Sequence, residues 1–275
     1  MIVASESHYA AHLAPVDIGD LDVALVASYK DLVAARGKGH KRIVLMQHGI
    51  GQSYSNTNPA YPGGRDNADV GLFLVPGEHP AQRWRDAYPD AAVEAVGSPR
   101  LDRLPARVPG PLTVAVTFHW LKDALPFYSA AMGDLAKRFH VIGHGHPRAN
   151  RLPWFWQSKG IEYVPDFDDV CRRADVLVFD NTSAGYEFAS TGRPVVVMNS
   201  PDYLPNVSHG LRFWDAAHVG QNVWHAGDLG DAVERALEHR PEDIAAREDA
   251  LDVVYAYRYG AGERAAQAIR EWALG

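Results

Sequence analysis

The stretch DVCRRADVLVFDNTSAGYEFASTGRPVVVMNSP, residues 169–201, decides the fold class. It contains two short apolar runs, Val176–Phe179 and Pro194–Met198, separated by an amphipathic segment over Ser183–Thr191. The runs are continuously apolar rather than alternating, which is typical of parallel strands that helices cover on both faces. Gly192 follows the amphipathic segment, as glycine commonly does at the end of a helix. The stretch therefore predicts a strand–helix–strand unit of a parallel α/β sheet.

The same alternation of short apolar runs and amphipathic segments extends along the chain. Further helices are predicted over Tyr29–Arg36, Pro80–Tyr88 and Leu121–Arg138. The other predicted strands are Met1–Ala4, Val23–Val26, Arg42–Met46, Val70–Val75, Ala92–Val96, Leu112–Phe118, His140–Gly143 and Glu162–Val164. This repetition predicts a doubly wound α/β architecture.

A proline-rich stretch, SPRLDRLPARVPGP (Ser98–Pro111), interrupts the alternation with four prolines. Such composition is typical of a linker, so we expect two Rossmann-like domains, residues 1–108 and 109–275. The chain is helical from Leu229 onward, and this C-terminal tail could cross back to brace the first domain. Two such domains would leave a cleft, and open α/β sheets bind ligands outside the carboxyl ends of their strands.

Length, charge and cysteine content exclude several classes of protein. The 275 residues carry a formal net charge of −7 and are 47% hydrophobic, which excludes a disordered chain. No apolar run reaches the ~20 residues that span a bilayer. The first residues also lack a secretory pattern, so we expect a cytoplasmic protein without an integral membrane segment. The single cysteine, Cys171, excludes internal disulfides and cysteine-cluster metal sites.

The acidic balance argues against broad binding to nucleic-acid phosphates. The densest basic run is RGKGHKR (Arg36–Arg42), for which we favour a solvated loop. A nucleic-acid acceptor is therefore possible but not indicated.

The first segment that carries chemistry is LMQHGIGQSYSN, residues 45–56. A strand ends at Met46, so His48 is expected at the sheet edge where ligands bind. Gly49 and Gly51 would let the backbone approach a phosphate or a sugar closely. The pKa of a histidine is ordinarily ~6.5, so His48 could accept a proton at neutral pH. The alternative is a turn histidine that only caps the next helix.

The second segment is FHVIGHGHPRAN, residues 139–150, in which a strand leads into His144 and His146. Neither a nearby acid nor a third histidine completes a convincing coordination set with these two residues, so no metal site is predicted. Beside Arg148, these histidines better suit an anionic group.

The third segment follows the strand Val176–Phe179 and opens a helix. Small hydroxyl residues at a helix start either cap the helix and nothing more, or form an anion site with the free N–H groups. Glu187 lies four residues after Ser183 and faces the same side of the helix, where a carboxylate could bind the hydroxyls of a ribose. The predicted donor-binding residues of this segment are Asp180, Asn181, Thr182, Ser183, Gly185 and Glu187.

Taken together, these segments resemble the CDP-glycerol glycerophosphotransferase family of teichoic acid synthesis. GSPRLD (Gly97–Asp102) matches its G-x-P-R-x-D element, and AVTFH (Ala115–His119) stands where the family has an A-P-T-W-R-like strand end. Residues 163–196 follow its D-x-x-D, A-D-V-L-I-T-D-Y-S-S and E/D-F-A elements nearly position by position. The resemblance covers about residues 42–223, and a weaker likeness connects the chain to nucleotide-sugar 2-epimerases.

The resemblance implies a GT-B fold with the nucleotide on the C-terminal domain and no metal requirement. His48 corresponds to the histidine of the family's tryptophan-histidine-glycine loop, the expected catalytic base. His146 corresponds to its His-Pro motif, which contacts the donor phosphates, and Thr182 and Ser183 match its serine pair. The chain departs from the family where Gln47 replaces the tryptophan and Asn181 replaces a tyrosine. His119, which stands near the family's arginine, is also predicted to bind the donor.

We therefore predict a transferase that moves a glycerophosphate or glycosyl group from CDP-glycerol or a nucleotide sugar to an acceptor hydroxyl of unknown type. His48 would be the general base and His146 a second catalytic residue, and no cofactor is expected besides the nucleotide-activated donor. One alternative is a 2-epimerase-like isomerase, which would need further carboxylates such as Asp66, Glu78 or Asp102. Another is a non-catalytic nucleotide-binding module.

Overall fold

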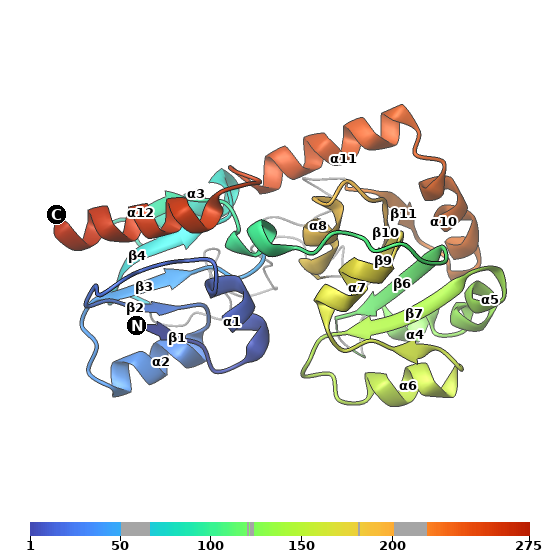
Figure 1. Cartoon of the computed structure of the whole chain (residues 1–275), viewed down its shortest axis with the longest axis horizontal. Coiled ribbons are helices and arrows are strands. Elements are labelled where there is room, and N and C mark those ends of the chain that lie inside the picture. Colours follow the sequence, from blue (N-terminus) through green and yellow to red (C-terminus); the bar gives the residue numbers. More distant parts are fainter. Residues whose placement is uncertain (51–66, 120, 122–123, 181, 201–218) are drawn as a thin grey trace. The chain divides into compact units, whose positions relative to one another are not determined.

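The computed structural model describes residues 1–50, 67–119, 121, 124–180, 182–200 and 219–275. The chain divides into two compact units (Figure 1). The first unit comprises Met1–Arg103 and Asp252–Gly275, and the second comprises Leu104–Asn206 and Ala217–Leu251. Each unit is built around its own parallel sheet, so the two predicted Rossmann-like domains are confirmed.

The sheet of the first unit has the strand order β1-β2-β3-β4-β5, with all neighbours parallel. Side chains of successive strand residues point to opposite faces, so Val44 packs with Leu13 and Ile269 while Leu45 packs with Leu32 and Trp84. Helices α1 and α12 thus cover one face, and α2 and α3 cover the other. The elements are β1 (Ile2–Val3), α1 (Ser7–Leu13), β2 (Ala24–Val26), α2 (Tyr29–Gly37), β3 (Ile43–Met46), β4 (Val70–Val75), α3 (Glu78–Ala87), β5 (Ala92–Ala95), η2 (Pro99–Arg103) and α12 (Ala261–Leu274).

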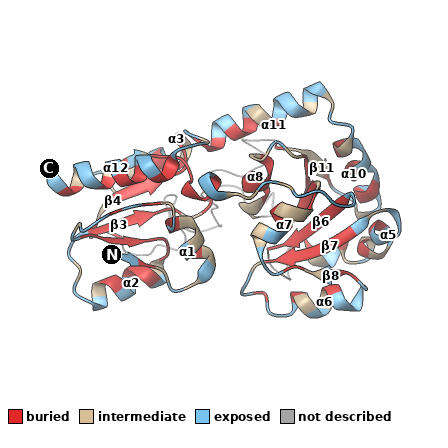
Figure 2. Ribbon diagram, viewed as in Figure 1, coloured by how far each residue is buried: buried red, intermediate tan, exposed pale blue. Residues whose placement is uncertain are grey.

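The sheet of the second unit has the order β11-β10-β9-β6-β7-β8, again with parallel neighbours. The chain order reverses between β6 and β9, and ligands of open α/β sheets bind at such a point. The strands of both sheets are largely buried (Figure 2). The elements are β6 (Thr113–Phe118), α4 (Leu125–Tyr128), α5 (Ala131–Arg138), β7 (His140–Gly145), α6 (Leu152–Ser158), β8 (Glu162–Tyr163), α7 (Phe167–Arg173), β9 (Val176–Phe179), α8 (Ala184–Ala189), β10 (Val195–Met198), β11 (Gln221–Val223), η4 (Ala226–Asp228), α10 (Leu229–Leu237) and α11 (Pro241–Val254).

All predicted strands are present with small shifts at their ends, whereas strand β11 and helices α6 and α7 were not predicted. Strand β11 has the polar sequence Gln-Asn-Val at the edge of its sheet, so it lacks the apolar run of a buried strand. Helix α1 was also missed. The helix predicted over Leu121–Arg138 is divided into α4 and α5.

The division into units differs from the predicted domains 1–108 and 109–275, because the last part of the C-terminal tail, Asp252–Gly275, belongs to the first unit. The Asp102 carboxylate accepts hydrogen bonds from the N–H groups of Gly260, Ala261 and Gly262, at 2.8, 3.3 and 2.7 Å. Gly97 has a φ of +87°, and a Cβ there would lie 2.4 Å from the Tyr257 carbonyl oxygen. The GSPRLD element therefore docks the start of α12, and this docking makes α12 part of the first unit.

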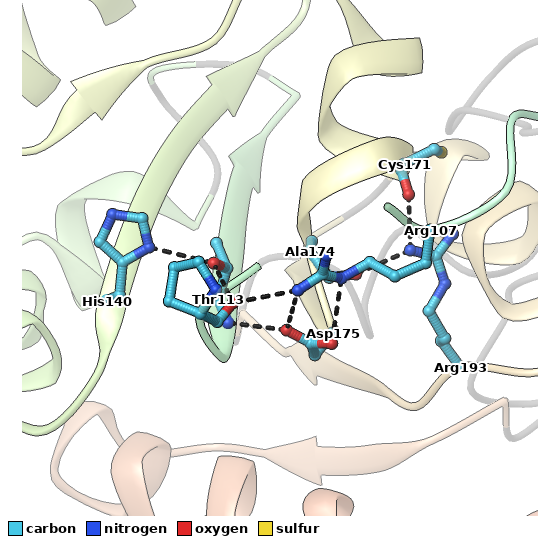
Figure 3. Close-up of polar contacts among 8 residues, drawn as sticks. Arg107, Thr113, His140, Cys171, Ala174, Asp175 and Arg193 are labelled. Atoms are coloured by element: carbon cyan, nitrogen blue, oxygen red, sulfur yellow. Dashed lines mark hydrogen bonds and ion pairs between the residues drawn. The ribbon is translucent and has the colours of Figure 1, made fainter. Parts of the chain in front are cut away.

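The remainder of the proline-rich stretch is held at the amino edge of the second sheet rather than forming a free linker (Figure 3). Arg107 donates from Nε and Nη2 to the two carboxylate oxygens of Asp175, at 3.1 and 3.0 Å. The same carboxylate accepts from the Thr113 N–H at 2.8 Å, and Val108 N–H bonds to the Arg172 carbonyl at 2.9 Å. The boundary between the units consequently falls after Arg103.

The helices of the described residues include none that is both long enough and apolar enough to cross a membrane.

Candidate functional site

In the first unit, His48 follows β3 at the carboxyl edge of the sheet, as predicted. Its Nδ1 lies 2.6 Å from the carbonyl oxygen of Ala27, which directly follows β2. A carbonyl oxygen can only accept, so Nδ1 carries the proton of this hydrogen bond. The neutral ring then has its lone pair on Nε2, which is the atom able to take a proton.

Two side chains of α1 surround the His48 ring. The Tyr9 ring centroid lies 4.6 Å away and the His12 centroid 6.2 Å away. Burial holds the pKa of His12 well below its ordinary value, and the nearby positive charges of His48, Arg100 and His8 lower that pKa further. Sequence reasoning missed these neighbours. A usable signal was the four-residue spacing of His8 and His12, which places both on one helix face.

The residues flanking His48 shape the loop. Gln47 is buried, and its Oε1 accepts from the indole N–H of Trp84 at 2.9 Å, so this side chain is anchored in the core. Gly49 has a φ of +71°, a conformation that glycine adopts without strain. The predicted residue Gly51 lies outside the described residues.

In the second unit, Asp180 connects the ends of β9 and β6 where the chain order reverses. Its side chain is fully buried, and both carboxylate oxygens accept from the backbone N–H of His119, at 2.8 and 3.0 Å. The carbonyl oxygen of Asp180 also accepts from the N–H of Thr182 at 2.9 Å. Asp180 therefore fixes the backbone at two of the predicted donor-binding residues.

His146 follows β7 and lies beside His119, with ring centroids 5.1 Å apart. The Nδ1 of His146 accepts a hydrogen bond from the backbone N–H of Arg148 at 3.2 Å. Because Nδ1 accepts, the neutral ring carries its proton on Nε2. His146 thus presents a hydrogen-bond donor suited to an anion, the opposite arrangement to that of His48.

Thr182 and Ser183 precede α8 and are both partly exposed. Thr182 Oγ1 accepts a hydrogen bond from the Ala184 N–H at 3.4 Å. This contact corresponds to the alternative in which the hydroxyl caps the helix. Among the residues that are described, the Ser183 side chain makes no cap hydrogen bond. Glu187 lies buried in α8, and Asn181 lies outside the described residues.

Two other predicted site residues, Gly185 and His144, have structural contacts that account for their type. A Cβ on Gly185 would lie 2.3 Å from the Phe179 ring, so close packing requires this glycine. His144 is buried in β7, with Nδ1 2.8 Å from the Val164 carbonyl oxygen, and burial lowers its pKa. Arg148 is exposed, and its backbone contacts His146. A donor-binding role for these three residues stays a prediction.

The carboxylates considered for epimerase chemistry have other contacts. Glu78 pairs with Arg85 on the exposed side of α3, and Asp102 binds the start of α12. Asp66 lies outside the described residues. Within the described part of the chain, no group of three or more His, Cys, Asp or Glu residues could hold a metal ion.

Similar proteins were found through their structures, while no protein-family model and no curated protein sequence matches the chain. A variant of the wall teichoic acid polymerase TagF superposes with a TM-score of 0.65 at 10% identity, covering 92% of this chain and 72% of that one. A Listeria monocytogenes protein described as a UDP-N-acetylglucosamine 2-epimerase superposes with a TM-score of 0.59 at 13% identity, covering 91% and 74%.

The calicheamicin glycosyltransferase CalG4 superposes with a TM-score of 0.50 at 15% identity, covering 91% of this chain and 73% of that one. Identities this low establish similarity of fold. The resemblance drawn from the sequence motifs is confirmed at that level, and the chain has the GT-B fold with two Rossmann-like units.

Proposed function

We propose that this GT-B chain is a transferase that moves a glycerophosphate or glycosyl group from a nucleotide-activated donor to an acceptor hydroxyl. The observation that carries the proposal is the contrast between two histidines at carboxyl edges of parallel sheets. His48 is held with its lone pair on Nε2, and His146 with a proton on Nε2. The first arrangement suits a base, and the second suits a donor of hydrogen bonds to phosphate.

In the proposed reaction, Nε2 of His48 removes the proton of the acceptor hydroxyl, whose oxygen attacks the donor. With CDP-glycerol the attack is at phosphorus and CMP leaves. With a nucleotide sugar it is at the anomeric carbon and a nucleoside diphosphate leaves. The Nε2–H of His146 and the hydroxyls of Thr182 and Ser183 stabilise the charge that builds on the departing phosphate. The donor is the substrate, and we propose that the reaction needs no metal or further cofactor.

The known proteins support this choice of donor. One of the TagF structures, with a TM-score of 0.61 at 11% identity, was soaked with CDPG. Among the other similar structures, CalG4 is described as a glycosyltransferase and the Listeria protein as a UDP-sugar epimerase. By analogy of fold, a nucleotide-activated donor is the substrate class that this chain would share with them.

A thermal-shift panel of CDP, CMP, UDP, GDP, ADP and TDP tests the donor site. We expect stabilisation by at least one nucleotide, its reduction in Ser183→Ala, and its retention in His48→Ala. A response to cytidine nucleotides alone identifies a CDP-alcohol donor, and a response to the others identifies a nucleotide sugar. Absence of any stabilisation would contradict the proposed donor site.

The same donors then separate transfer from the alternatives. Release of CMP or a nucleoside diphosphate that depends on an acceptor supports transfer. A donor converted without an acceptor, with its nucleotide still attached, supports an isomerase. Nucleotide binding without turnover for any acceptor supports a binding module.

A further inference from the structure

Asp31 is a buried carboxylate in the first turn of α2, outside the residues to which the proposed function assigns a role. Its side chain is 0% exposed. Oδ1 accepts from the backbone N–H of Ser5 at 2.7 Å, and Oδ2 accepts from the hydroxyl of Ser28 at 2.7 Å. The Ser28 hydroxyl oxygen in turn accepts from the backbone N–H of Asp31 at 3.1 Å. The contacts thus connect the end of β1 to the start of α2.

The residue before Ser28 is Ala27, whose carbonyl oxygen accepts the Nδ1 proton of His48 at 2.6 Å. Ser28 is itself buried, and its carbonyl accepts from the Leu32 N–H at 2.9 Å as the first helical bond of α2. The turn between β2 and α2 is therefore held from both sides of Ser28. Because Ala27 precedes Ser28 directly, the hydrogen bonds of Ser28 also orient the Ala27 carbonyl group.

We propose that Asp31 is a positioning residue for His48, acting through Ser28 and the Ala27 carbonyl to keep the His48 proton on Nδ1. The catalytic role of Asp31 rests on the proposed function, in which Nε2 of His48 is the base. A role limited to capping α2 would stabilise the helix without affecting the tautomer of His48. The tautomer is thus the quantity that distinguishes the two roles.

Long-range proton–nitrogen NMR of histidine-labelled protein measures the tautomer directly, and His48→Ala assigns the signal. In the unmodified chain we expect protonated Nδ1 and unprotonated Nε2 for neutral His48. Asp31→Ala should lose the Nδ1–H signal. Asp31→Asn should retain most of it, because the amide oxygen can still accept from Ser5 and the amide N–H can donate to the Ser28 oxygen. A misplacement of this kind can lower turnover by about 10²-fold.

Val93→Ala is the matched control, because Val93 is a buried residue of β5 in the same unit. It destabilises the core without touching the turn, and should leave the tautomer unchanged. If Asp31→Ala fails to fold, Ser28→Ala removes only the hydroxyl connection and should also lose the Nδ1–H signal. The proposal is overturned if these variants keep the wild-type tautomer, or if Val93→Ala changes it equally. Failure of the proposed function would appear separately, as absence of turnover with the tautomer effect intact.

Discussion

Replacing Asp102 should loosen the docking of the C-terminal helix on the first unit. Three backbone N–H groups at the start of α12, from Gly260, Ala261 and Gly262, donate to this one carboxylate. Loss of a helix N-cap acceptor costs about 0.5–2 kcal/mol. Loss of a negative charge from a helix N-terminus costs a further ~0.3–1 kcal/mol. Because the carboxylate is at the surface, we expect Asp102→Ala to destabilise the docked helix by about 1–2 kcal/mol in total.

Amide hydrogen exchange is the suitable assay, because a chain with two units need not unfold in one transition. A loss of 1–2 kcal/mol corresponds to roughly 5–30-fold faster exchange at the amides of Gly260, Ala261 and Gly262. Asp102→Asn should give a smaller increase, since its amide oxygen still accepts hydrogen bonds.

Glu263→Ala is the control for charge alone. Glu263 is an exposed acid in the first turn of the same helix. Its removal should accelerate exchange much less than Asp102→Ala does. The reasoning would be refuted by wild-type exchange rates in Asp102→Ala, or by equal acceleration in Glu263→Ala.

Three further perturbations test the site and its surroundings. His48→Ala should lower kcat by about 10²–10⁴-fold while the nucleotide-induced thermal shift persists, and full turnover would exclude His48 as the base. Gly185→Ala should destabilise the second unit by about 1–3 kcal/mol, because the new Cβ would lie 2.3 Å from the Phe179 ring. Gly133→Ala is its control in urea unfolding, since nothing lies within 4 Å of a Cβ there. The lowered pKa of His12 means that the unfolded chain binds more protons below pH ~6.5, so stability present above that pH is lost as the pH falls. His12→Gln should reduce that acid-side loss, and an unchanged pH profile would contradict the assignment.

The domain boundary shows why local composition can mislead. Four prolines between Ser98 and Pro111 are typical of a linker. In the structure, Asp102 binds α12 from more than a hundred residues away, and Arg107 pairs with Asp175. Both partners are distant in sequence, so the composition of the stretch carries no trace of them.

The candidate site was predictable to the extent that it depends on strand ends. His48, His146 and Asp180 each follow an apolar run, and parallel strands bring such positions to one edge of a sheet. Tyr9 and His12 were not predicted as neighbours of His48, because α1 has only 7 residues and is too short for its apolar spacing to mark a helix. Asp31 was missed for a different reason, since an acid in the first turn of a helix is ordinary in any sequence.

The sequence by itself determined the two parallel α/β units, because continuous apolar runs and the helices between them have few ways to bury their surfaces. It also determined which polar residues follow the strands. Only the tertiary structure decided which nitrogen of each histidine holds the proton, and it makes the opposite choice in His48 and His146. That choice depends on whether a carbonyl oxygen or an N–H group lies within about 3 Å of Nδ1, and for His48 the partner is Ala27, which follows a different strand of the sheet.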